Sequence, residues 1–325
     1  MEEFNLIEFH RTRDFGKKIN TTFEFIKQNF KPLLKSILLI AGPAVLIGSI
    51  MLGAFFSDFL AISFKGNQSA ETLKYFTSFS FWGQMGLMYV FLFLSYVISL
   101  ATINSYIVLY YKKKTNQIEV SEVWDNVRSL LWKYLGSLLL IVLSACLIVF
   151  IGVILGIVFQ QISGVLLAIL IVGFVIGFIY LTVGISFVFF IQAFEGASFF
   201  DAAARSLKLV RGKWWSTFGL SFILSLIGGA ISYIFIIPYY IFMLTSMMHN
   251  VQSGGAIEMS PTLKTVSYVF FTLYYMSQML CYSLPHVGIS FQYFNLVELK
   301  ESKGLLSDIE NFGKPVEPDQ PTETF

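Results

Sequence analysis

Residues 193–215 read AFEGASFFDAAARSLKLVRGKWW and lie between two long apolar runs. On a helical wheel, positions 199, 203, 207, 210 and 214 share one apolar side, whereas Asp201, Arg205 and Lys208 lie on the opposite side. Ser198, with an acidic residue three positions later, predicts a capped helix start. An amphipathic helix that leads directly into an apolar run is typical of a segment in the membrane interface.

The composition indicates that most of the chain is solvated by lipid. Of its 325 residues, 56% are hydrophobic and 13% are charged, against about 25% charged residues in soluble domains. The 35 phenylalanines would be hard to bury in a soluble core of this size. The net charge of +2 offers no strong field for nucleic acid. We therefore predict the lipid bilayer as a partner and no nucleic acid.

Six apolar runs are long enough to cross about 30 Å of hydrocarbon: Leu34–Phe56, Phe81–Tyr110, Leu135–Phe159, Gly164–Ile191, Thr217–Leu244 and Val266–Tyr293. All but three of the 22 lysine and arginine residues fall on one side of the resulting arrangement. The positive-inside rule then places both termini in the cytoplasm of a bacterial cell, with the chain in the inner membrane. The predicted divisions are a cytoplasmic segment with an amphipathic helix (1–33), a six-helix membrane domain (34–300), and a cytoplasmic helix with a disordered tail (301–325).

The amphipathic pattern occurs three times, each time before a pair of apolar runs. Near the N-terminus the apolar positions are 15, 19, 23, 26 and 30, and Asp14 takes the cap position. A weaker copy has apolar positions 123, 127, 130 and 134, with Ser121 as the expected cap. The fold class is thus an all-α membrane protein whose six transmembrane helices form three repeats of interfacial helix plus helical hairpin.

The interfacial helices are predicted to contact lipid or a partner protein. The residues expected to make these contacts are Phe199, Arg205, Lys208, Arg211, Lys213, Trp214, Trp215 and Trp132. Lysine and arginine near the surface attract anionic headgroups, and tryptophan favours the interface. Three roles stay open at this point: anchoring the hairpins, packing on one another or over an inner cavity, and binding a particular lipid headgroup.

The interiors of the spans contain few polar residues and no Asp, Glu, Lys or Arg near their middles. The candidate intramembrane polar site is formed by Asn104, Gln278 and His286, and His286 follows Pro285. These side chains either line a substrate cavity or make hydrogen bonds between helices. Gly152 and Gly156 in the third run, and Gly173 and Gly177 in the fourth, predict close packing of those two helices.

Catalytic motifs are missing from the sequence. The three histidines are far apart, the only cysteines, Cys146 and Cys281, lie in apolar runs, and no phosphate-binding glycine loop or paired carboxylates occur on one helical face. We therefore expect no enzymatic activity, no catalytic residues, no cofactor and no metal site.

The segment SFFDAAARSLKLVRGKWWSTFGL, residues 198–220, resembles a signature of bacterial six-span proteins related to the membrane domain of some glycerophosphodiester phosphodiesterases. The ending FQYFNLVELKESKGLL, residues 291–306, is similar to the end of a largely uncharacterised Bacteroidota branch of these proteins. The resemblance implies a six-span fold over about residues 14–306. It implies no phosphodiesterase activity, because no soluble catalytic domain accompanies the spans.

Without catalytic groups or intramembrane charges, the sequence favours a non-enzymatic subunit or scaffold of a larger envelope assembly, such as protein export or membrane insertion machinery. The predicted outer loops 58–80 and 246–265 and the C-terminal tail are the surfaces expected to meet a membrane-protein partner. The alternative is a carrier or permease for a lipid or small amphiphile, with Asn104, Gln278 and His286 in its cavity.

Overall fold

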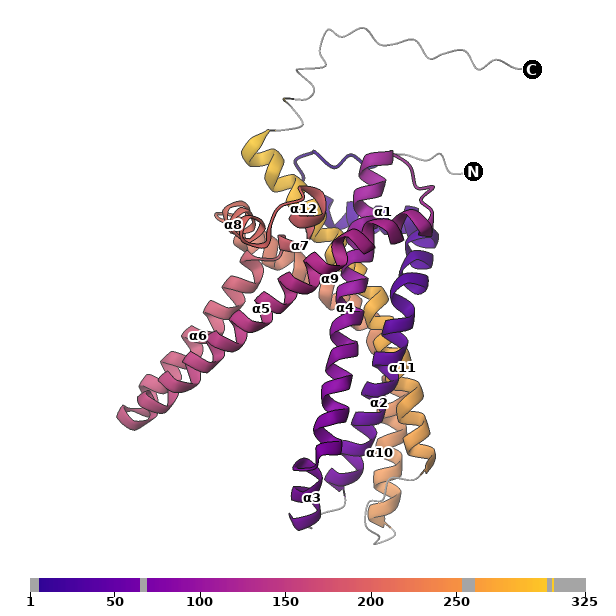
Figure 1. Cartoon of the computed structure of the whole chain (residues 1–325), viewed down its shortest axis with the longest axis vertical. Coiled ribbons are helices and arrows are strands. Elements are labelled where there is room, and N and C mark those ends of the chain that lie inside the picture. Colours follow the sequence, from indigo (N-terminus) through magenta and orange to yellow (C-terminus); the bar gives the residue numbers. More distant parts are fainter. Residues whose placement is uncertain (1–5, 65–68, 253–260, 303–305, 307–325) are drawn as a thin grey trace, which may run out of the picture.

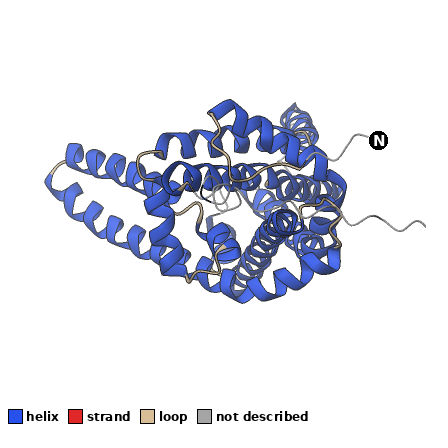
Figure 2. Ribbon diagram, turned by 90° about the horizontal axis from the view of Figure 1, so that it is seen from above, coloured by secondary structure: helices blue, strands red, loops and turns tan. Residues whose placement is uncertain are grey.

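The computed structural model describes residues 6–64, 69–252, 261–302 and 306, and these residues form helices and loops without a strand (Figures 1 and 2). The elements in chain order are α1 (Phe15–Ser36), the π-helix η1 (Ile37–Ala41), α2 (Gly42–Phe64), α3 (Ser69–Phe76), α4 (Phe79–Lys113), α5 (Val120–Ile162), α6 (Gly164–Gly184), α7 (Val188–Phe194), α8 (Phe199–Val210), α9 (Trp214–Tyr233), α10 (Ile237–Gln252), α11 (Pro261–Cys281) and α12 (Ser283–Glu301).

Within the described residues, five helical segments are long and apolar enough to cross a membrane: Phe15–Phe59, Phe79–Lys113, Val120–Ile162, Gly164–Phe194 and Trp214–Tyr233. The predicted all-α class with membrane-length helices is therefore confirmed. The predicted sixth run is not among these segments, and in the structure it is divided at Tyr282 between α11 and α12. The six-span count, the repeats and the sidedness stay predictions.

The helices form two legs that diverge from a common end (Figure 1). One leg is the hairpin of α5 and α6, and the other is a bundle of α2, α4, α9, α10 and α11. We call the common end the junction: α1, α7 and α8 lie there, together with the end of α4 and with α12. Seen from above, the hairpin extends away from the rest of the molecule (Figure 2).

The main hydrophobic core lies in the junction. Every residue of α4 from Leu100 to Tyr110 is buried, and nearly all of α12 from Ser283 to Val297 is buried too. The chain before α1 adds to this core, since the Phe9 ring stacks on Phe291 at 5.2 Å and meets Phe294 edge-on at 4.9 Å. A helix buried on all sides is a central element of a fold, and α12 has that position here.

Prolines lie at the interruptions of the long apolar runs. Proline has no amide N–H to donate and its ring crowds the preceding turn. The π-helix ends just before Pro43, the turn Ile234–Ile236 precedes Pro238, and α12 begins shortly before Pro285. The fifth and sixth predicted runs are each divided in this way, into α9 and α10 and into α11 and α12, whereas α4 is continuous.

The N-caps confirm two of the three predicted helix starts. The Asp14 carboxylate accepts a hydrogen bond from the Lys17 amide at 2.8 Å, and the Ser198 hydroxyl accepts one from the Asp201 amide at 3.3 Å. The third cap prediction, Ser121, is wrong. The cap of α5 is Glu119, which forms a reciprocal capping box with Glu122 and so satisfies free amides of the first turn.

The apolar arc predicted for α1 is not its buried face. Phe15, Phe23 and Phe30 are exposed, in keeping with a helix that lies in the membrane interface. The side packed against the protein is mixed in polarity and consists of Lys18, Thr21, Thr22, Phe25, Asn29, Leu33 and Ser36. Asn29 accepts a hydrogen bond from the Tyr106 hydroxyl at 2.9 Å, which fixes α1 to α4. The helix is continuous through the predicted boundary at residue 33.

The C-terminal prediction falls almost wholly outside the described residues. Helix α12 ends at Glu301, and Ser302 caps it in a left-handed conformation. Of the predicted region 301–325, only residues 301, 302 and 306 are described.

Close backbone contacts in the bundle generate a stability prediction. A Cβ at Gly53 of α2 would lie 3.2 Å from the Tyr268 Cα of α11, whereas one at Gly83 of α4 would meet nothing within 4 Å. We expect Gly53→Leu to separate the two helices and to lower the free energy of unfolding by about 1–3 kcal/mol. The matched Gly83→Leu change should be nearly neutral. Thermal unfolding in mild detergent measures both, and equal effects would contradict the packing described.

Candidate functional site

The residues predicted for lipid or partner contact lie together at the junction, but they make different kinds of contact. Arg205 and Lys208 belong to α8, Arg211 and Lys213 to the link between α8 and α9, and Trp214 and Trp215 to the first turn of α9. Gly212, with φ of 80°, allows the sharp turn between the two helices. The residues predicted to form one contact surface therefore fall into three groups. Arg205 forms internal ion pairs, Lys208, Arg211 and Lys213 form a basic group, and the tryptophans form an aromatic group.

Arg205 is engaged inside the protein. Its guanidinium donates to Glu195 Oε1 at 2.6 Å and to both carboxylate oxygens of Glu301 at 3.1 and 3.2 Å. The Tyr293 hydroxyl also donates to Glu195. Although burial opposes it, the hydrogen bonds to Glu301 and Glu195 raise the pKa of Arg205 above its usual value. This arginine joins α8 to α12 and is not free for a headgroup.

Lys300 of α12 lies against the end of α8. Its ammonium donates to the backbone carbonyls of Lys208 and Arg211 at 2.8 and 2.9 Å. Burial, followed by the nearby charges of Arg211, Lys208 and Lys213, lowers the pKa of Lys300. Cations at a helix C-terminus satisfy free carbonyls, but here they also repel one another. The result is a concentrated positive patch.

The tryptophans form a partly exposed belt. The Trp214 indole donates to the Tyr180 carbonyl at 3.2 Å and stacks on the Tyr180 and Phe218 rings, which ties α9 to α6. Trp215 and Trp132 are 77% and 80% exposed. Phe199 is half-buried beside Phe200. Exposed indoles next to long apolar helices are typical of the level of the lipid headgroups.

One site residue was missed by the sequence predictions. The Lys18 ammonium of α1 donates to Gln292 Oε1 at 2.7 Å and to the Ser216 hydroxyl at 2.9 Å, and the Gln292 amide donates to the Thr217 hydroxyl at 3.0 Å. This network joins α1, α9 and α12. Its sequence signal is the 4-3-4 spacing of Lys18, Thr22, Phe25 and Asn29, which all lie on the buried face of α1.

The three intramembrane polar residues do not share one group of contacts. The Asn104 amide donates to the Tyr134 hydroxyl at 2.9 Å, and that hydroxyl donates to the Phe189 carbonyl, so Asn104 links helices. His286 lies against the Tyr282 ring at 4.4 Å, at the break between α11 and α12. In the described part of the chain, His286 Nε2 and Gln278 Oε1 have no hydrogen-bond partner.

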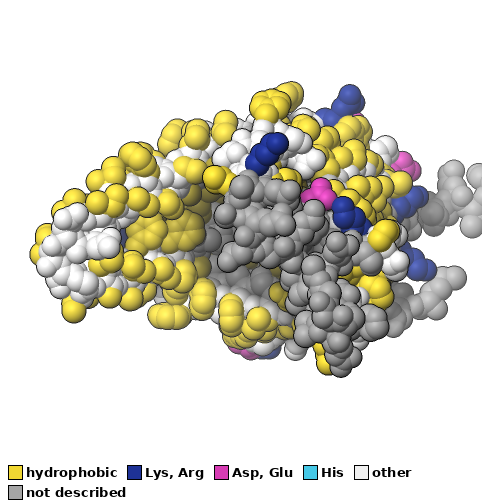
Figure 3. Space-filling model, turned by 90° about the horizontal axis from the view of Figure 1, so that it is seen from below, with side chains coloured by type: hydrophobic (Ala, Val, Ile, Leu, Met, Phe, Trp, Pro, Cys, Tyr) yellow, Lys and Arg dark blue, Asp and Glu magenta, His cyan; other side chains and the backbone are white. Residues whose placement is uncertain are grey.

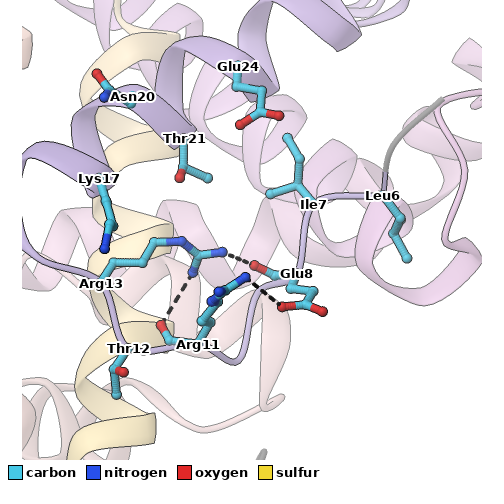
Figure 4. A pocket seen from close by; sticks show the side chains of 10 residues that line it. All are labelled: Leu6, Ile7, Glu8, Arg11, Thr12, Arg13, Lys17, Asn20, Thr21 and Glu24. Atoms are coloured by element: carbon cyan, nitrogen blue, oxygen red, sulfur yellow. Dashed lines mark hydrogen bonds and ion pairs between the residues drawn. The ribbon is translucent and has the colours of Figure 1, made fainter. Parts of the chain in front are cut away.

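A polar cleft of about 660 Å³ lies between the chain before α1 and α1 itself (Figure 4). Arg11, Arg13 and Lys17 line it together with Glu8 and Glu24. Arg13 donates to the Phe9 and Glu8 carbonyls, and Arg11 pairs with the Glu8 carboxylate at 3.4 Å. These cations are engaged by the chain's own acceptors. Among the described residues, no group of three or more His, Cys, Asp or Glu residues is placed to hold a metal ion.

Residues 123–278, just under half of the chain, match the model of a domain of unknown function (DUF7847). The match runs from the first turns of α5 to the last part of α11, so it contains the hairpin, α8 and α9. No curated protein and no solved structure matches the chain.

The ion pairs of Arg205 lead to a prediction that separates it from its basic neighbours. Arg205→Gln should lower the free energy of unfolding by about 1.5–3 kcal/mol, because charged hydrogen bonds to two carboxylates are lost. Lys208→Gln removes an exposed charge whose side chain has no described partner, and it should change stability by less than about 0.5 kcal/mol. Thermal unfolding in detergent compares the two variants, and equal losses would show that the pairs to Glu195 and Glu301 contribute little.

Proposed function

We propose that this protein is a multi-pass protein of a bacterial inner membrane that acts, without enzymatic activity, as a subunit or scaffold of a larger envelope assembly. The observation that carries the proposal is the α5–α6 hairpin, which is available to a transmembrane helix of a partner protein. Protein export or membrane insertion machinery is the class of assembly that we propose as its host.

The hairpin is exposed along its apolar length. The most apolar windows of α5 and α6 bury none of their residues, whereas those of the first two span-length segments bury 33% and 44%. Hydrophobic side chains cover much of the hairpin when it is viewed from below (Figure 3). A helical pair that packs on the rest of its own protein only near one end leaves most of its surface for lipid or for other helices.

Small residues on the hairpin favour a helical partner over lipid alone. Gly152 of α5 is used within the hairpin, since a Cβ there would lie 2.8 Å from the Phe174 ring of α6. Gly173 and Gly177 of α6 are exposed, and a Cβ at either position would meet nothing within 4 Å. Small residues four positions apart let a second helix approach closely in lipid. The face that carries Gly173 and Gly177 is therefore the proposed partner contact.

We propose six spans with both termini in the cytoplasm. The fifth span combines α9 with α10, and the sixth combines α11 with the first part of α12. The junction then lies at the cytoplasmic surface, in agreement with the excess of Lys and Arg there. Three units of interfacial helix plus hairpin follow from the same assignment, beginning with α1, the first turns of α5, and α8.

A second candidate function is a carrier or permease for a lipid or small amphiphile. The observation that favours it is the pair of buried polar atoms, Gln278 Oε1 and His286 Nε2, that lack a described partner near the break between α11 and α12. Unsatisfied polar groups at membrane depth are costly unless a ligand, water or neighbouring group completes them.

The proposed topology predicts the accessibility of introduced cysteines after Cys146 and Cys281 are replaced by Ala. Cysteines at Thr77 and Gln161, both exposed near the far ends of the legs, should react with a membrane-impermeant thiol reagent in intact spheroplasts. Cysteines at the exposed positions Asn20 and Gln117 should react only after lysis. Labelling of Gln117 from outside would overturn the proposed sidedness.

The partner contact predicts a selective loss of binding. With the protein expressed at its native level and purified in mild detergent, Gly173→Leu together with Gly177→Leu should remove a stoichiometric membrane-protein partner, because larger side chains block close approach. Val172→Leu, a change at an exposed position of the same helix, should retain it. Thermal unfolding should be unchanged in both variants. A wild-type protein that purifies without any stoichiometric protein, but with bound lipid, would favour the carrier function instead.

A further inference from the structure

The Lys18 ammonium is buried without an anionic partner. The residue is only 3% exposed, and its two described acceptors, Gln292 Oε1 and Ser216 Oγ, are neutral. Asp14, one turn earlier, attracts Lys18 at longer range but makes its ion pair with Lys17, at 3.3 Å. Removing a charge from water is costly unless an opposite charge or several hydrogen bonds compensate. Among the described residues, Lys18 therefore has two neutral acceptors and no direct ion pair.

Lys213 lies close to Lys18, since the Lys18 ammonium contacts Ser216, three residues after Lys213. The positive charge of Lys213 repels that of Lys18. Lys213 also repels Lys300, which is repelled by Lys208 and Arg211 as well. We call Lys18, Lys208, Arg211, Lys213 and Lys300 the basic patch. No ion pair to a carboxylate is described for any of its members, while the neighbouring carboxylates of Glu195 and Glu301 are held by Arg205. Such a patch attracts an anion with several oxygens.

The first turn of α9 adds hydrogen-bond donors beside these charges. Lys213 occupies the N-cap of α9, and no side chain caps this helix. The amides of the first turn have no partner within the helix, and they suit a phosphate or carboxylate. Since the Ser216 hydroxyl accepts from Lys18, its own proton is available to a further acceptor.

An apolar track leads away from the patch along α9. Trp215, Phe222, Leu226 and Tyr233 are 77%, 52%, 56% and 54% exposed. At 100° per residue these four positions fall within about 40° of one another, so they form one straight stripe. The stripe begins in the first turn of α9, where Ser216 contacts Lys18, and continues down the length of the helix. Its length and chemistry suit an acyl chain.

We propose that the junction binds one anionic phospholipid, with its phosphate at Lys213 and the first turn of α9, beside the buried charge of Lys18, and an acyl chain along Trp215, Phe222, Leu226 and Tyr233. The phosphate supplies the missing negative charge and accepts from the free donors. A soluble anion would satisfy the charge but would leave the stripe unused. The site is independent of the partner contact on α6, because it lies on other helices.

The test is a titration of the full-length protein in a neutral detergent with phosphatidylglycerol or phosphatidylcholine of equal chain length, followed by thermal unfolding and native mass spectrometry. Phosphatidylglycerol should raise the Tm and remain as one bound molecule, whereas phosphatidylcholine should do neither. Lys213→Gln changes an exposed residue without a described side-chain bond and should weaken phosphatidylglycerol binding about fivefold. Lys18→Gln, at the buried charge, should weaken it more, if its fold is retained.

The matched control is Lys112→Gln, an exposed lysine at the end of α4 outside the patch, which should leave the affinity unchanged. Equal weakening by Lys112→Gln and Lys213→Gln, or equal binding of the two lipids, would overturn the proposal. Stabilisation by inorganic phosphate or glycerol 3-phosphate as strong as that by phosphatidylglycerol would also overturn it, in favour of a site for a soluble phosphate. Weaker binding after Leu226→Ser, with no change toward inorganic phosphate, would support the acyl track.

Discussion

The hydrogen bond between Lys18 and Gln292 is the contact on which the junction depends. Gln292 lies on the buried helix α12, accepts from α1 through Lys18, and donates to α9 through Thr217. In a bilayer, apolar surfaces gain little by meeting each other, because lipid tails are as apolar as leucine side chains. Directional polar contacts and close packing must therefore determine which helices associate, and most of the described polar contacts between helices lie at this end of the molecule.

The same reasoning explains why the legs diverge. Below the junction, α5 and α6 pack on each other at Gly152, but the apolar windows of both helices bury no residue against the rest of the chain. In water such a hairpin would collapse onto the bundle, since burial of apolar area stabilises by about 25 cal/mol per Å². In lipid that driving force is missing, so a separated hairpin is a stable arrangement. The divergence of the legs agrees with the lipid environment that the composition indicates.

The sequence predicted the helical class and the helices that begin after the caps Asp14 and Ser198, because helix periodicity and capping are local properties. It did not predict which side of α1 is buried. The phenylalanines of the apolar arc face outward, and the mixed face of Lys18, Thr22 and Asn29 meets the protein. The usual rule that apolar residues face the core reverses when the surroundings are lipid. The division of the sixth run also escaped prediction, because a hydropathy window does not resolve a break at a single residue, Tyr282.

The basic residues of segment 193–215 likewise have different roles. Only their tertiary contacts show which residue has which role. Arg205 and Lys208 are three residues apart on the same polar arc of the wheel, yet Arg205 reaches Glu301, ninety-six residues away, while no side-chain partner is described for Lys208. The difference comes from the position of α12, which no local pattern encodes. A charge with two carboxylate partners stabilises the fold, and charges with none attract ligands. The basic residues of this segment therefore have two physical roles: Arg205 forms ion pairs within the fold, and Lys208 stays exposed without a described side-chain partner.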